Sequence, residues 1–138
     1  MRFWPRNNFE AQETCRTIIE SELTKSNFSI YGWRQVPVNS KVLGEKADRT
    51  RPDITQVLFR HNDAELNGKQ LERCLYESRR KIENKALKHS LEGFYICSLR
   101  YTSIIYKGLF LEESISDFYM DLKLYLIPIC MFLRTLRC

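Results

Sequence analysis

The sequence has few of the residues that build metal centres, and its cysteines follow no metal-binding or redox spacing. It contains two histidines and five cysteines in 138 residues. None of the cysteines forms a Cys-x-x-Cys pair, so neither a zinc knuckle nor a thiol redox motif is indicated. We expect no metal site, and reduced, partly buried thiols in a cytoplasmic protein. The cysteines are Cys15, Cys74, Cys97, Cys130 and Cys138.

Long apolar runs and dense positive charge are also missing. The apolar stretch from Leu122 to Leu133 is shorter than a membrane span, and Lys123 and Pro128 interrupt it. The first residues of the chain contain no apolar core of a signal peptide. The net charge of +5 is modest, whereas a nucleic-acid-binding protein usually carries a denser basic patch. These absences predict a chain that binds neither membranes nor nucleic acid.

The length and composition are those of one folded domain. A chain of 138 residues that is 43% hydrophobic is long enough and apolar enough to bury a core. No internal repeat, low-complexity segment or linker divides it. The predicted order of elements is helix, strand, strand, helix, strand, strand, helix, which is typical of an α+β fold with a layered core.

The first half of the chain predicts one helix and two strands. Asn7 or Asn8 caps a helix that ends near residues 26–27. Strands follow over residues 28–36 and 54–59, with an ordered loop at 39–52 between them. The apolar positions of the helix, expected to face the core, are Cys15, Ile18, Ile19 and Leu23. Its acidic positions, expected to face solvent, are Glu10, Glu13, Glu20 and Glu22.

The second half predicts a capped helix and a hairpin. Asn67 and Gln70 stand in the positions of a capping box, and the inner stripe of the helix behind them is Leu71, Leu75, Ser78 and Ile82. Residues 94–99 are apolar on both faces, so we expect a strand that is covered on both sides. Residues 103–106 are its expected antiparallel partner, and a short helix is expected within 111–119.

Three groups of residues are open to a functional and to a structural interpretation, and we favour the structural one for each. Trp33 and Arg34 are either a ligand-stacking pair or, as we favour, a packing residue and an ion-pair partner. The basic run at residues 79–81, with Lys85 and Lys88, either binds phosphates or forms a solvated helix face. Lys107 is either a catalytic residue or, as we favour, a surface residue at the end of a strand.

An uncommon pattern at residues 32–38, Gly-Trp-Arg-Gln-Val-Pro-Val, is followed closely by Leu43-Gly44. Four further segments accompany it in order, at residues 1–5, 71–83, 94–109 and 118–122. Together they resemble the glutamine amidotransferase domain of the large subunit of glutamate synthase. The resemblance covers residues 1–123, which we interpret as a partial class II (type 2) amidotransferase domain. Residues 124–138 form a divergent apolar tail, and our hypothesis is that a frameshift near Lys123 places them out of frame.

The resemblance implies a fold and an activity. The fold is part of a four-layer αββα sandwich of the N-terminal-nucleophile hydrolase type. The activity of the parent enzyme, an oxidoreductase of glutamate biosynthesis and ammonia assimilation, is hydrolysis of the glutamine side-chain amide by an N-terminal cysteine. Ammonia is then channelled to 2-oxoglutarate, which becomes glutamate with FMN and an iron–sulfur cluster as cofactors. The electron donor is NADPH or ferredoxin.

The residues that do this chemistry in the family have no counterpart in the sequence. Cys15 falls on the predicted helix and Cys97 in the middle of a predicted strand, so neither replaces the nucleophile. The family's glutamine-binding phrase and its oxyanion-hole residues are also missing. We therefore expect a fragment that is inactive alone, with no catalytic, cofactor-binding or metal residues of its own and the remainder of the large subunit as its partner. The alternative is a standalone, non-enzymatic α+β module that binds a protein partner through its apolar tail.

Overall fold

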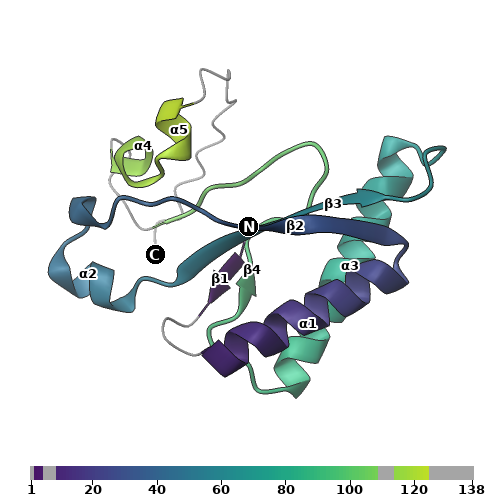
Figure 1. Cartoon of the computed structure of the whole chain (residues 1–138), viewed down its shortest axis with the longest axis horizontal. Helices are drawn as coiled ribbons and strands as arrows, with labels where there is room; N and C mark the ends of the chain where they lie inside the picture. The colour runs from purple at the N-terminus through teal and green to yellow at the C-terminus, as the bar shows by residue number, and fades with distance from the viewer. Residues whose placement is uncertain (1, 5–8, 109–113, 125–138) are drawn as a thin grey trace.

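A computed structural model describes residues 2–4, 9–108 and 114–124 of the chain. These residues form a four-stranded sheet with the order β2-β3-β1-β4 (Figure 1). All three strand pairs are antiparallel. The strands are β1 (Arg2–Trp4), β2 (Phe28–Gln35), β3 (Asp53–His61) and β4 (Tyr95–Ile96). The predicted α+β class is therefore confirmed as a mixture of helices and strands.

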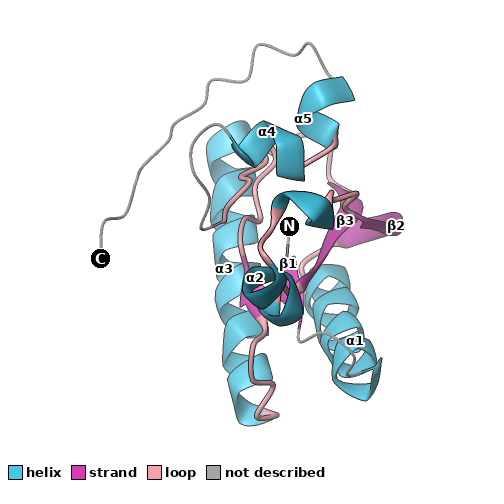
Figure 2. Cartoon of the chain, turned by 90° about the vertical axis from the view of Figure 1, so that its left-hand side faces the viewer, coloured by secondary structure: helices cyan, strands magenta, loops and turns pink. Residues whose placement is uncertain are grey.

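Two long helices, α1 (Phe9–Lys25) and α3 (Gly68–Lys88), cover one face of the sheet (Figures 1 and 2). The predicted capping box starts α3: Asn67 Oδ1 accepts from Gln70 N at 3.0 Å, and Asn67 N donates to Gln70 Oε1 at 3.1 Å. Helix α1 ends where Asn27 takes a left-handed conformation, with φ of 62°. The core between the helices and the sheet consists of Ile18, Ile19, Leu23, Phe28, Leu75, Ile82 and Ile96.

The prediction that Glu22 faces solvent is wrong. Glu22 is buried between the two helices, where Lys85 Nζ donates to its Oε1 at 2.5 Å and Lys25 Nζ donates to the same atom at 3.2 Å. Lys85 lies on α3, so the pairing holds the two helices together. The hydrogen bond from Lys85 lowers the pKa of Glu22, and burial opposes it only in part.

The predicted loop at residues 39–52 contains two short helices. Ser40–Val42 is a 3₁₀ turn (η1), in which Asn39 Oδ1 accepts from Lys41 N at 3.2 Å. Helix α2 (Glu45–Thr50) follows it directly. Both helices are short and lie in a polar, Gly-containing segment. Apolar periodicity alone therefore predicts a loop there.

A second, smaller core lies on the opposite face of the sheet. Side chains of β3 contribute to both cores, because successive residues of a strand point to opposite faces of the sheet. Val57 and Phe59 pack toward the helices, whereas Ile54 packs in the second core. Helices α4 (Ile115–Phe118) and α5 (Asp121–Leu124) lie on this side, away from α1 and α3 (Figure 1). The core consists of Val36, Ile54, Cys97, Phe118 and Tyr119.

The predicted hairpin over residues 94–106 is largely replaced by irregular backbone. Strand β4 contains only Tyr95 and Ile96, and residues 103–106 form no strand. The two segments still lie side by side, because Cys97 Sγ donates to Ile105 O at 3.2 Å and Ile105 N donates to Ser98 Oγ at 3.4 Å. Side-chain contacts thus replace the ladder that the alternating pattern predicted. The strand also has one open face, since Tyr95 is exposed.

Candidate functional site

Four polar side chains from distant parts of the chain meet beside the second core. We call Arg34, Gln56, Tyr106 and Asp121 the polar clamp. Arg34 forms an ion pair with Asp121 through Nη2, and its Nη1 donates to Gln56 Oε1 at 3.0 Å. The Tyr106 hydroxyl donates to the other carboxylate oxygen of Asp121 at 3.4 Å. The clamp therefore joins β2, β3, the segment that follows β4, and the first residue of α5.

The clamp is enclosed on the Asp121 side and open on the Arg34 side. Asp121 is only 3% exposed, whereas 41% of the Arg34 side chain is exposed. Burial raises the pKa of the Tyr106 hydroxyl, and the neighbouring Asp121 carboxylate raises it further, so Tyr106 stays a neutral donor. Gln56 is also a hydrogen-bond partner of the Tyr106 hydroxyl, and this contact offsets part of the rise in the Tyr106 pKa.

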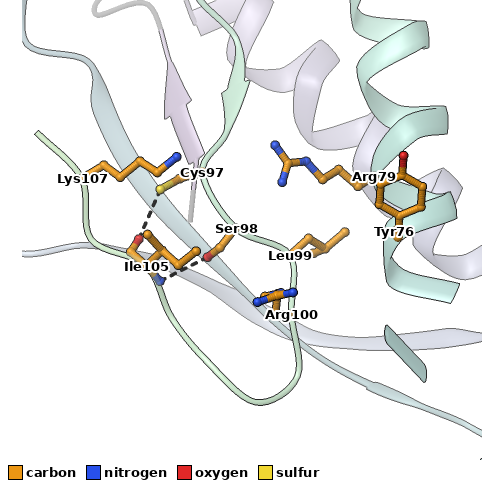
Figure 3. Close-up of a pocket in the computed structure, with 8 residues that line it drawn as sticks. All are labelled: Tyr76, Arg79, Cys97, Ser98, Leu99, Arg100, Ile105 and Lys107. Atoms are coloured by element: carbon orange, nitrogen blue, oxygen red, sulfur yellow. Dashed lines mark hydrogen bonds between the residues drawn. The ribbon is translucent and has the colours of Figure 1, made fainter. Parts of the chain in front are cut away.

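A separate cavity of about 270 Å³ opens between α3 and the segment that follows β4 (Figure 3). Of the eight described residues that line it, three are cationic, namely Arg79, Arg100 and Lys107, and none is acidic. We call this space the basic cavity. Cys97 and Ser98 lie at its wall, each bonded to Ile105 as described above.

Two of the cations act on the thiol of Cys97. Figure 3 shows the Lys107 side chain running past the Cys97 sulfur, and the guanidinium of Arg79 directed toward the same region. Burial raises the pKa of Cys97, and the charges of Lys107 and Arg79 offset only part of this effect. The thiol is therefore neutral at pH 7 and adds no negative charge to the cavity.

Each cation of the basic cavity is held in place by a contact outside it. Lys107 Nζ donates to the Tyr95 hydroxyl at 2.9 Å and lies 5.4 Å from the centre of its ring. Arg79 donates from Nη2 to Ile96 O at 2.9 Å and from Nε to Glu83 Oε1 at 2.8 Å. Arg100 Nε lies 3.5 Å from a carboxylate oxygen of Glu72. These contacts fix the side chains and leave other N–H groups available.

None of the described cysteines is arranged as a nucleophile. Cys15 is buried on α1, Cys74 is half-buried on α3, and Cys97 is buried with a raised pKa. A reactive thiol needs exposure and a lowered pKa. Burial and a raised pKa therefore make Cys97 a poor nucleophile.

The structural interpretations of Trp33 and Arg34 are confirmed. Trp33 packs against the main core while its Nε1 donates to Glu20 Oε1 at 2.5 Å, and Arg34 is the ion-pair partner of Asp121. The basic run on α3 is largely neutralised within the helices. Arg79 and Arg80 both pair with Glu83, and Lys85 pairs with Glu22. This pairing supports a solvated helix face for Arg80 and Lys85, whereas Arg79 also lines the basic cavity.

The polar clamp was not predicted from the sequence. Its members lie at positions 34, 56, 106 and 121, so no local spacing connects them. The available signal was Gln56, a polar residue at a core-facing position of a strand that is otherwise apolar there.

Metal and membrane features are absent from the described part: no three His, Cys, Asp or Glu side chains gather as metal ligands. No described helix has the length and apolar character to span a bilayer.

Comparison with known proteins gives one family. A family model described as "Glutamine amidotransferases class-II" matches residues 1–135. The glutamate synthase [NADPH] large chain of Azospirillum brasilense is 48% identical over 120 residues, which are 87% of this chain and 8% of that protein. Ferredoxin-dependent glutamate synthase 2 of a Synechocystis strain is 37% identical over 113 residues, or 82% of this chain and 7% of that protein.

A eukaryotic glutamate synthase is similar to this chain over a comparable share of its length. The glutamate synthase [NADH] of Saccharomyces cerevisiae is 34% identical over 122 residues, which are 85% of this chain and 6% of that protein. The chain thus spans less than a tenth of the length of each of these three relatives.

Proposed function

Because this chain belongs to the class-II glutamine amidotransferases, we propose that it is part of the domain that hydrolyses glutamine in a glutamate synthase. The observation that carries the proposal is similarity over more than four-fifths of the chain to glutamate synthases that are named for three different electron donors. In this proposal, ammonia released from the glutamine amide is passed to 2-oxoglutarate in another part of the same polypeptide, and glutamate is formed there.

The proposed fold is one half of a four-layer αββα sandwich. The described sheet has helices α1 and α3 on one face and only partial cover on the other. There, Tyr31 is 66% exposed and Leu58 is 54% exposed. An apolar, incompletely covered sheet face supports a second sheet packing against it. We place that second sheet in the remainder of the large subunit.

We also propose that the chain is inactive alone. Hydrolysis requires a thiolate that attacks the amide carbon, donors that stabilise the oxyanion, and water that later releases glutamate. The cysteine environments of the described residues offer no such thiolate. Purified polypeptide is expected to release no ammonia from glutamine above the rate in buffer. Ammonia release above that rate would contradict this part of the proposal.

FMN, the iron–sulfur cluster and the electron donor are assigned to other parts of the parent protein. The described residues hold no group of three potential metal ligands, so they offer no place for a cluster. Cys74 and Cys97 are free thiols, which supports a reducing, cytoplasmic location.

The division of the chain is a further part of the proposal. We assign residues 1–123 to the amidotransferase domain and residues 124–138 to a separate apolar tail, which lies outside the described residues from position 125. Asp121 is tied into the sheet by Arg34, which supports a domain that extends at least this far. A chain ending at residue 124 is expected to unfold at the same urea concentration as the longer chain. A clear fall in the midpoint would instead assign the tail to the domain.

A chimera tests the main proposal directly. Residues of this chain replace the matching 120-residue segment of the Azospirillum large chain, and glutamate formation from 2-oxoglutarate is measured with glutamine as nitrogen source. Activity with glutamine is expected to survive the exchange. Direct supply of ammonia is the control, because it bypasses the amidotransferase domain. A chimera that uses ammonia but not glutamine would count against the proposal.

A standalone interaction module is the second candidate, favoured by the exposed apolar side chains Tyr31 and Leu58. In this case the sheet face or the tail binds a protein partner and no parent enzyme exists. Sedimentation of the purified chain separates the two candidates. A folded, soluble monomer favours the module, whereas a chain recovered only from inclusion bodies favours the part of a larger domain.

A further inference from the structure

We propose that the basic cavity is a binding site for a small oxyanion, a group of the carboxylate or phosphate type. The inference goes beyond the amidotransferase assignment and does not depend on it. The observation that carries it is the set of charges: Arg79, Arg100 and Lys107 line one cavity, and none of the described acidic residues does so.

The positive charges are close enough to influence one another. The charge of Arg79 lowers the pKa of Lys107, and both charges lower the pKa of the Cys97 thiol. Bringing two cations together is unfavourable unless an anion lies between them. Two of the cations have ion-pair partners, and both partners lie outside the cavity. Arg79 pairs with Glu83, and Arg100 pairs with Glu72. Among the described residues, no carboxylate lines the cavity itself.

Donors remain for a ligand after these contacts are made. The contact of Arg100 with Glu72 uses Nε, which leaves the outer edge of the guanidinium, a planar fork that matches two oxygens of one oxyanion. Lys107 Nζ uses one of its protons on Tyr95 and keeps two. The cavity of about 270 Å³ admits a molecule larger than a halide ion but much smaller than a peptide.

The fold also fixes the cations before any ligand arrives. The Tyr119 hydroxyl donates to Lys107 O at 2.6 Å, and Arg79 is bonded to the end of β4 through Ile96 O. Side chains that are already positioned lose less entropy on binding, which favours a specific site over diffuse attraction to a basic surface.

Titration of the 138-residue chain with inorganic phosphate, and separately with malonate, tests the proposal. Amide ¹⁵N–¹H shifts are followed while ionic strength is held constant with sodium chloride. Saturable shifts are expected at residues 97–107. Preference for phosphate identifies a tetrahedral ligand, and preference for malonate identifies a carboxylate; either one supports the site. Shifts that rise without saturation, or that chloride abolishes at equal ionic strength, would overturn it.

Variants separate the cavity from the general positive charge of the chain. Lys107→Gln and Arg100→Gln each remove one charge-assisted hydrogen bond and are expected to weaken binding by about tenfold. Lys81→Gln is the matched control, since Lys81 is an exposed cation on the helix that carries Arg79 but does not line the cavity. Equal weakening in all three variants would mean that the anion senses only net charge. The Arg100 side chain is exposed, so the test remains available if Lys107→Gln misfolds.

Discussion

Removal of Arg34 from the polar clamp is expected to destabilise the fold strongly. Arg34→Gln leaves the Asp121 carboxylate, which is 3% exposed, with the Tyr106 hydroxyl at 3.4 Å as its remaining side-chain partner in the described structure. Breaking a fully buried ion pair by removing one partner costs about 3–5 kcal/mol. The Arg34 side chain is 41% exposed, and solvent weakens its attraction to Asp121. We therefore expect a loss of about 2 kcal/mol in the free energy of unfolding.

A double-mutant cycle measures the pair itself. Asp121→Asn keeps the shape of the side chain, removes its charge and leaves Arg34 partly in water. It is therefore expected to cost less than Arg34→Gln. The two changes together are expected to cost less than the sum of the single changes, with a coupling of at least about 1 kcal/mol. Urea unfolding at pH 7, followed by tryptophan fluorescence and far-UV circular dichroism, gives the four free energies.

An exposed ion pair in the same chain provides the control. Glu45 and Arg49 lie four residues apart on α2, and their side chains are 81% and 76% exposed. A cycle with Glu45→Gln and Arg49→Gln is expected to give a coupling below about 0.5 kcal/mol. If the Arg34–Asp121 cycle is additive to the same degree, burial of Asp121 does not strengthen the pair and the reasoning above is wrong.

Three further predictions concern the helices and the thiols. Lys85 holds the pKa of Glu22 below 4.5. The contribution of the Glu22 carboxylate to the free energy of unfolding is therefore present above pH 4.5 and is lost as the pH falls through the lowered pKa. Glu22→Gln should flatten this acid limb in urea midpoints measured from pH 7 to pH 3. Asn67→Ala should cost about 1 kcal/mol by removing the cap of α3, whereas Asn67→Ser should cost less than about 0.5 kcal/mol; equal losses would exclude capping as the cause. Iodoacetamide, with peptide mapping by mass spectrometry, should label half-buried Cys74 before buried Cys97, and the reverse order would place Cys97 in an open environment.

The two long helices could be predicted because their determinants are local. In α1, the apolar positions recur at helical spacing, and in α3 the capping box lies within four residues. The same method misplaced Glu22, since its burial depends on Lys85, 63 residues further along the chain. Periodicity reports which side of a helix is apolar, but a polar residue at the edge of that side is buried or exposed according to a partner that the local pattern does not contain.

Strands were predicted less completely because a strand requires a neighbour. The apolar character of residues 28–36 and 54–59 indicated β2 and β3, which pair with each other along most of their length. The pattern of residues 94–106 is equally apolar, yet β4 contains only Tyr95–Ile96. There, the side chains of Cys97 and Ser98 bond to the backbone of Ile105, and side-chain hydrogen bonds of this kind compete with a regular ladder.

The polar clamp and the basic cavity depend on one segment, residues 97–107, and this is why neither could be derived from local sequence. Tyr106 contacts Asp121 in the clamp, while the adjacent residue, Lys107, contributes its charge to the cavity. The carbonyl of Lys107 accepts from the buried Tyr119 hydroxyl, and Tyr119 pairs with Val38 just beyond β2. The position of the cavity's charge is therefore set by contacts with the second core, so the stability of that core and the geometry of the cavity are expected to be lost together.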